Sequence, residues 1–114
     1  MFLQNSYYKG IITEYIAIIY LFLHGYTILK RRYKTKFGEV DIIASKNHSI
    51  IGVEIKARFG KEPTPEYVFD KQRERIKRAL NYFIIKNQDK YIKYSVLTEI
   101  IIFKNYFSLK HYKN

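Results

Sequence analysis

Four charged residues lie within two apolar stretches of the sequence, GEVDIIAS and SIIGVEIKA. They are Glu39 and Asp41 in the first stretch and Glu54 and Lys56 in the second. Both stretches are typical of β-strands, whose side chains alternate between the two faces. Glu39 and Asp41 therefore share a face of their strand, and so do Glu54 and Lys56. Carboxylates beside a lysine are a combination that can bind a divalent cation and a phosphate group.

A turn at Asn47-His48 between the two stretches predicts a hairpin. Counting outward from this turn places Asp41 opposite Glu54 and Glu39 opposite Lys56, with all four on one face. Facing Cβ atoms lie about 5 Å apart, so Asp41 and Glu54 would repel each other unless a cation lay between them. We therefore expect Asp41 and Glu54 to bind Mg²⁺ or Mn²⁺. The alternative is a solvent-exposed face on which Glu39 and Lys56 form an ordinary surface ion pair.

Two further polar residues lie on apolar faces of predicted helices. Glu14 is spaced among Ile11, Ala17 and Ile18, where an unpaired carboxylate is costly. It needs a metal, an opening to water, or neutralisation by Lys or Arg. Gln72 lies near the middle of the inward stripe of the second helix, and it either hydrogen-bonds a strand end or reaches the same site.

The elements that position these residues follow from apolar periodicity and from breaker residues. A helix is expected from Asn5 or Ser6 to about His24, with Gly25 as its stop. A second helix is expected from Tyr67 to about Lys86. Strands are expected at residues 26–35, 38–45, 49–57 and 94–103, and residues 106–112 form a fifth strand or a tail. The order α-β-β-β-α-β predicts an α/β layered domain, and 114 residues suggest one domain over 1–114.

The charge of the chain favours a polyanionic partner. Lys and Arg number 21 against 10 Asp and Glu, which gives a formal net charge of +11. We expect the partner to be nucleic acid, with recognition of its structure rather than its sequence, because no base-reading motif is visible. The candidate phosphate contacts are Lys30, Arg31, Arg32, Lys34, Lys36, Arg58, Lys61 and a helical stripe of Lys71, Arg75 and Arg78.

A membrane is not the expected partner. The uninterrupted apolar run IAIIYLFL is far shorter than the roughly 20 residues that a span needs. The first helix also lacks the polar face of an interfacial helix. The chain has no cysteine, which excludes disulfides, thiol catalysis and zinc–thiolate sites. This composition fits a reducing compartment, and the N-terminus lacks the pattern of a signal peptide, so we expect a cytoplasmic protein.

The segments Gly38-Glu39-Val40-Asp41 and Val53-Glu54-Ile55-Lys56, together with Glu14, resemble the PD-(D/E)XK nuclease superfamily. More narrowly, the chain resembles the small bacterial YraN family of endonuclease-like proteins, related to archaeal Holliday-junction resolvases, from about Gly10 to the C-terminus. The resemblance implies a restriction-endonuclease-like core with a mixed central sheet flanked by helices. It implies Asp41 and Glu54 as metal ligands, Lys56 as the catalytic lysine and Glu14 as an accessory acid.

Three positions depart from the family pattern. Val40 replaces the proline of the motif name, Thr13 stands where glycine is usual, and Leu97-Thr98-Glu99 stands where Arg-Phe-Asp is expected. Resolvase relatives act as dimers, so the resemblance adds a homodimer to the states to be tested.

These observations predict a metal-dependent endonuclease that hydrolyses phosphodiester bonds, acting on DNA of particular structure. Asp41, Glu54 and Lys56 would form its centre, with Glu39 or Glu14 holding a second metal or positioning water, and Gln72 nearby. The alternatives are a non-catalytic nucleic-acid-binding module on the same fold and a protein of the membrane surface.

Overall fold

The first helix begins and ends where its capping residues predict. The computed structural model describes residues 5–62 and 65–113, and α1 spans Ser6–Leu23. The Asn5 side chain accepts a hydrogen bond from the Tyr7 backbone N–H at 2.8 Å. Gly25 follows the helix at a φ of +88°, a backbone conformation that favours glycine. Within the described ranges, neither α1 nor any other helix is long and apolar enough to cross a membrane.

The remaining elements confirm the predicted order. They are β1 (Thr27–Thr35), β2 (Gly38–Lys46), β3 (Ser49–Ala57), α2 (Glu66–Lys86), α3 (Gln88–Tyr91), β4 (Ser95–Asn105) and β5 (Ser108–Tyr112). The segment left open as a strand or a tail is thus a fifth strand. The short helix α3 was not expected, because a single turn is too short to show a periodic apolar pattern.

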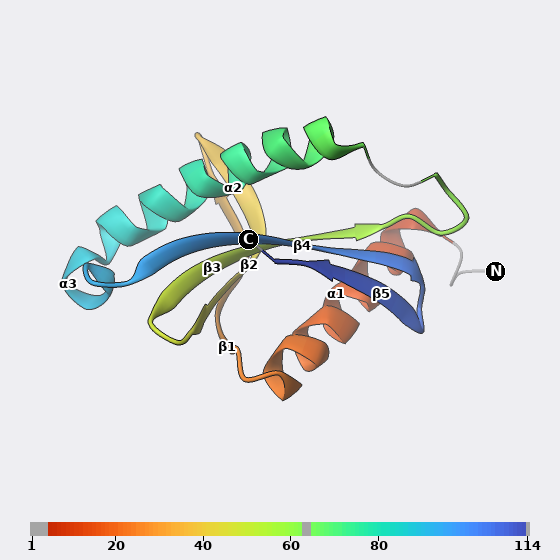
Figure 1. Ribbon diagram of the computed structural model, residues 1–114, viewed down its shortest axis with the longest axis horizontal. Helices are drawn as coiled ribbons and strands as arrows, with labels where there is room; N and C mark the ends of the chain where they lie inside the picture. Colours follow the sequence, from red (N-terminus) through yellow and green to blue (C-terminus); the bar gives the residue numbers. More distant parts are fainter. Residues whose placement is uncertain (1–4, 63–64, 114) are drawn as a thin grey trace.

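A five-stranded mixed sheet forms the centre of the protein. Its strand order is β1-β2-β3-β4-β5, with β3 and β4 parallel and the other neighbours antiparallel. Helix α2 covers one face and α1 the other (Figure 1). Each helix closes an apolar cluster: Ala17, Leu21, Ile42, Val53 and Phe103 lie on the α1 face, and Val40, Ile43, Ile50, Ile76 and Leu80 lie on the α2 face. The fold class predicted from the sequence is therefore confirmed.

The close approach of α2 to β3 depends on Gly52. A Cβ atom at this position would overlap Ile76 Cγ2 and lie 3.0 Å from Leu80 Cδ1. We expect Gly52→Ala to lower the free energy of unfolding by about 1–3 kcal/mol, because an added methyl group overpacks the core. Gly10→Ala is the control, since nothing lies within 4 Å of its added Cβ and alanine stabilises an exposed helical position by up to about 1 kcal/mol. Urea denaturation measures both, and a Gly52→Ala midpoint equal to the parent's would contradict the contact.

A buried carboxylate ties the C-terminal strand to α1. Glu99 Oε1 accepts a hydrogen bond from the Tyr26 hydroxyl at 2.7 Å and lies 2.6 Å from His111 Nε2. The other ring nitrogen of His111 lies 2.9 Å from the Tyr20 hydroxyl of α1. Although burial opposes it, the hydrogen bonds from His111 and Tyr26 hold the pKa of Glu99 below its usual value. The departure from the family pattern at Glu99 therefore lies in a structural network between α1, β4 and β5.

Candidate active site

The hairpin between β2 and β3 has the predicted even register. Asn47 and His48 form its two-residue turn with φ of +50° and +61°, as the tight hairpin turn with positive φ at both positions requires. The His48 ring stacks on Tyr94 at a centroid distance of 5.3 Å. Backbone pairing then runs from Lys46–Ser49 to Ile42–Val53, one step short of the predicted pair of Asp41 and Glu54.

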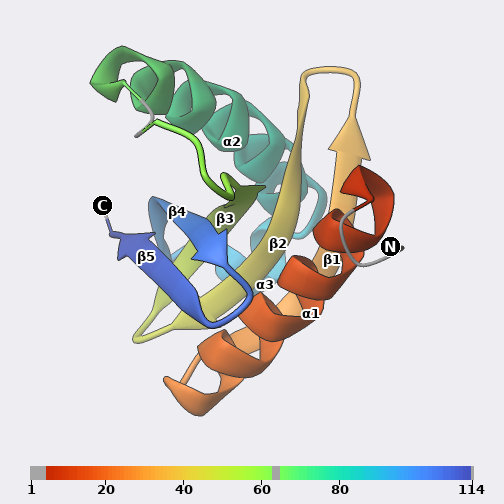
Figure 2. The ribbon, with the colours of Figure 1, turned by 90° about the vertical axis from the view of Figure 1, so that its right-hand side faces the viewer.

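The strands separate directly after this pairing, at Asp41. The paired register of β2 and β3 ends at Ile42–Val53, and Asp41 Oδ2 accepts a hydrogen bond from the Ile55 backbone N–H at 2.8 Å. Val40 packs on the α2 face although Ile42, two residues away, packs on the α1 face. The alternation of the strand is thus reversed at Asp41, as at a β-bulge. Figures 1 and 2 show the β1–β2 hairpin diverging from β3.

The neighbouring strand β1 is irregular at the same level. Its register with β2 pairs Arg31 with Ile42 and Tyr33 with Val40, which leaves Arg32 opposite Asp41. Arg32 has a φ of +50°, which is uncommon for any residue other than glycine and stores strain. The strain lies beside the candidate site, where such backbone outliers are often found.

In the fork where β2 leaves β3, the carboxyls of Asp41 and Glu54 lie close enough for each to shift the pKa of the other. The Glu54 side chain is only 14% exposed. Burial, and then the charge of Asp41, raise the pKa of Glu54 to about 7. Burial also raises the pKa of Asp41, although the Ile55 N–H bond opposes this shift. Lys56 Nζ lies 3.8 Å from Glu54 Oε1, so one cation already stands beside the pair.

The predicted pairing of Glu39 with Lys56 is wrong. Glu39 pairs with Lys34 on β1, and the ion pair of Lys56 is with Glu54. Because β2 leaves β3 at Asp41, the register counted from the turn no longer applies two residues further on. Glu54 and Lys56 share the α2 face, whereas Glu39 and Asp41 line a hollow of about 260 Å³ together with Glu14. The four groups therefore do not share one face of a flat hairpin.

Glu14 is neutralised by two adjacent arginines, which was one of the alternatives left open by the sequence. Its carboxylate oxygens lie 3.1 Å from Arg31 Nη2 and 3.1 Å from Arg32 Nε. The positive φ of Arg32 accompanies this arrangement, in which consecutive strand residues reach the same carboxylate. Glu14 still borders Asp41, because both line a second hollow of about 300 Å³ beside Thr13. The Thr13 hydroxyl donates to the Lys9 carbonyl at 2.8 Å.

Gln72 offers an unused acceptor over the end of β3. It is buried, and its Oε1 has no hydrogen-bond partner among the described residues. One turn after Gln72, Ile76 of α2 contacts β3 at Gly52. One turn before it, Phe69 packs on Tyr112 of β5 at a centroid distance of 4.8 Å. Gln72 therefore lies above the part of the sheet that holds Glu54. An unpaired buried carbonyl oxygen is costly, and a cation or a water in the fork would satisfy it.

The donor set fits a hard cation such as Mg²⁺. The described residues contain no cluster of three or more His, Cys, Asp or Glu side chains, so protein carboxylates would supply only part of the coordination. Mg²⁺ is commonly bound in this way, by one or two carboxylates with water and substrate phosphate in the other positions. Asp41 and Glu54 are the residues that would hold it.

Among the predicted phosphate contacts, Arg32 and Lys34 line the hollow that contains Asp41. Arg31 and Arg32 bind Glu14 but keep side chains that are 40% and 55% exposed. Arg78 donates to the Phe37 carbonyl at 3.2 Å and so joins α2 to the β1–β2 turn. The others are Lys30, Lys34, Lys36, Lys61, Lys71 and Arg75, which are exposed, and Arg58, which is half-buried. Sequence reasoning did not single out Lys104 and Lys110, which line a cavity with Arg58 and Lys61, because the pairing of the last two strands was not predicted.

Comparison with known proteins identifies relatives over most of the chain. The profile of "Uncharacterised protein family UPF0102" matches residues 13–102. A UPF0102 protein of Rhizobium etli (strain CIAT 652) is 36% identical over 81 residues, which are 71% of this chain and 66% of the relative. A UPF0102 protein of Bartonella tribocorum is 34% identical over 98 residues, which are 86% of this chain and 75% of the relative. The match thus spans just under two thirds of the Rhizobium relative's length.

Proposed function

We propose that this chain, which belongs to the uncharacterised protein family UPF0102, is a metal-dependent nuclease. It would hydrolyse phosphodiester bonds, with DNA of particular structure as its substrate. The observation that carries the proposal is the carboxyl pair Asp41–Glu54, largely withdrawn from water beside Lys56 in the fork between β2 and β3. Because the pKa of Glu54 is about 7, both carboxyls are charged only above about pH 7, where their repulsion opposes folding and a divalent cation would reverse the sign of the interaction.

Each residue of the fork has a role in this chemistry. When bound by Asp41 and Glu54, Mg²⁺ or Mn²⁺ supplies Lewis acidity and lowers the pKa of an attacking water. The Lys56 ammonium offsets negative charge that develops on the phosphate in the transition state. Gln72 Oε1 accepts a hydrogen bond from water in the fork. Exposed cations such as Arg75 and Lys34 hold the flanking phosphates without reading bases.

The fold and motif also support a wider kinship. The α-β-β-β-α-β order, the mixed sheet and the Asp41…Glu54-Ile55-Lys56 spacing are what the PD-(D/E)XK nuclease superfamily would provide. We extend the proposal to membership of that superfamily and to a relationship with archaeal Holliday-junction resolvases. A shared fold alone does not establish a shared activity, so the site must be tested directly.

A cleavage screen tests the proposed activity. Parent protein, stripped with EDTA and supplied with Mg²⁺ or Mn²⁺, is incubated with single-stranded, duplex, flap and four-way-junction DNA, and with an RNA hairpin. We expect metal-dependent cleavage of at least one branched or tailed DNA, and its loss in Asp41→Asn, which removes a ligand charge. Cleavage that survives in Asp41→Asn would come from a contaminating nuclease or another site, and absence of cleavage from every substrate would remove the proposal.

One observation favours a second candidate, a nucleic-acid-binding module without catalysis. Glu14 is held by Arg31 and Arg32, so it does not provide a free third carboxylate for a second metal. A module of this kind would bind DNA with an affinity that falls steeply as salt rises, because counterions are released on binding. Binding of this kind in the same screen, without any metal-dependent product, would select this second function.

A further inference from the structure

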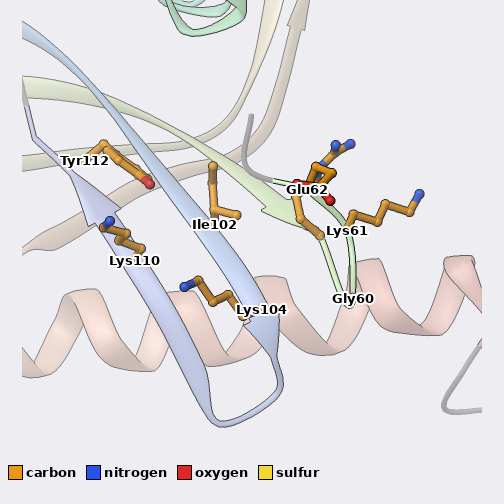
Figure 3. Close-up of a pocket in the computed structure, with 8 residues that line it drawn as sticks. Gly60, Lys61, Glu62, Ile102, Lys104, Lys110 and Tyr112 are labelled. Carbon is orange, nitrogen blue, oxygen red and sulfur yellow. The ribbon is translucent and has the colours of Figure 1, made fainter. Parts of the chain in front are cut away.

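A further, strongly basic cavity lies beyond the end of β3. It has a volume of about 380 Å³ and lies between residues 58–62, which follow β3, and the β4–β5 hairpin. Figure 3 shows Lys104 and Lys110 on the hairpin and Gly60, Lys61 and Glu62 on the facing segment. Arg58 is the fourth basic residue of the lining, and Glu62 is its one acidic residue. The cavity therefore favours an anion.

The register of the sheet aligns residues that line this cavity on β4 and β5 with residues of the candidate active site on β3. Lys56 on β3 pairs with Ile102 on β4, and Ile102 pairs with Lys110 on β5. One step earlier, Glu54 pairs with Ile100, and Ile100 with Tyr112. Neighbouring strands are about 4.8 Å apart, so β5 runs about 10 Å from β3. This separation corresponds to one or two nucleotides of an extended strand.

Arg58 lines the cavity and carries a buried donor that has no acceptor among the described residues. Its backbone N–H donates to the Phe103 carbonyl at 2.8 Å, which fixes the root of the side chain. Its Nε is buried and has no hydrogen-bond partner among the described residues. A buried donor of a charged group that lacks an acceptor is costly. A phosphate oxygen is a fitting acceptor, because guanidinium binds phosphate through two parallel hydrogen bonds.

The cavity also has an apolar side and a limited size. Ile102 and Tyr112 line it, and the Tyr112 ring is held by its contact with Phe69 of α2. Lys110 Nζ lies 5.5 Å from the centre of the same ring. The volume is near the lower end of the range of about 300–1,000 Å³ for small-molecule sites. Such a cavity admits one nucleotide with its sugar and base, but it is too small for a base pair within a duplex.

We propose that this cavity binds one phosphorylated nucleotide of a single-stranded segment that adjoins the phosphate held at the carboxyl fork. The substrate class is then a nucleic acid that carries a single-stranded arm beside its duplex. Arg58, Lys104 and Lys110 hold the phosphate, and Tyr112 with Ile102 contacts the sugar and base. This inference rests on the proposed function for its position relative to the scissile bond, but binding of the arm can be measured without catalysis.

Binding in the presence of EDTA tests the inference. The probes are a fluorescent blunt DNA hairpin and the same hairpin with a single-stranded thymidine tail on either strand, titrated by anisotropy at fixed salt. The parent is expected to bind a tailed hairpin more tightly than the blunt one. Lys104→Gln/Lys110→Gln is expected to weaken binding of the tailed hairpin about tenfold or more and to leave the blunt hairpin little changed.

A matched control removes the same charge elsewhere. Lys90→Gln/Lys93→Gln changes two exposed lysines in and just after α3, a helix that lies at the opposite end of the protein from the β4–β5 turn (Figure 1). It is expected to weaken tailed and blunt probes equally and slightly. Equal losses on both probes in Lys104→Gln/Lys110→Gln, or a parent that does not prefer a tail, would overturn the inference. The binding assay contains EDTA and therefore does not depend on catalysis. Tail-dependent binding can be observed even if the cleavage screen finds no product, and cleavage can be observed without any preference for a tail.

Discussion

Replacing Lys56 by methionine is expected to lower the rate of nucleic-acid cleavage by about 10²–10³-fold, the usual effect of removing one group that stabilises transition-state charge. Lys56 Nζ lies 3.8 Å from Glu54 Oε1, and the Lys56 side chain is 40% exposed. Methionine keeps most of the length of the chain and removes the ammonium. Single-turnover cleavage with saturating protein, on the substrate selected by the screen, measures the chemical step.

Metal binding separates this role from that of the carboxylates. A protonated lysine has no lone pair for a cation, so Lys56→Met is expected to keep the rise in melting temperature that Mg²⁺ or Mn²⁺ gives the parent. That rise corresponds to about 2.7 kcal/mol when the ion is at one hundred times its Kd. Asp41→Asn is expected to show a much smaller rise. An equal rise in the parent and in Asp41→Asn would place the ion elsewhere, and full activity in Lys56→Met would remove lysine from the mechanism.

Replacing Glu54 by glutamine is expected to stabilise the metal-free protein above pH 7, by an amount on the order of 2 kcal/mol. Burial and the charge of Asp41 raise the pKa of Glu54 to about 7 in the folded protein, from an ordinary value of 4.5. A raised carboxyl pKa means that the folded state holds a proton that the unfolded state has released. The parent therefore gains stability from this group as the pH falls from about 7 to 4.5, and loses it as the pH rises.

Urea denaturation in EDTA at pH 5 and pH 8 measures this effect as a difference between variant and parent. The difference is expected to be large at pH 8 and small at pH 5, because the parent carboxyl is then protonated like the neutral amide. Glu74→Gln, which removes an exposed carboxylate of α2, is the control and should show no such dependence. A Glu54→Gln variant less stable than the parent at pH 8 would show that the carboxylate is already compensated within the fold.

Local sequence patterns determined the elements and the centre of the candidate site. The Asn5 cap, the Gly25 stop and the apolar stripe of α2 depend on contacts within a few residues, and each is found as predicted. The two-residue turn at Asn47-His48 likewise fixed the register as far as Ile42–Val53, next to Asp41 and Glu54. Side-chain parity is reliable over this distance because each step of a paired strand turns the side chain to the other face.

Tertiary structure alone decided what surrounds that centre. The count from the turn fails at Glu39, because β2 leaves β3 at Asp41 while Arg32 takes a positive φ opposite it. Nothing within a few residues of Arg32 encodes that conformation; it accompanies the ion pair with Glu14 on α1. The basic cavity likewise depends on the parallel pairing of β3 with β4, across the whole of α2, which aligns Lys56 with Lys110 through Ile102. Contacts between segments so distant in sequence leave no periodic signal in either one, since they are set by how the layers pack.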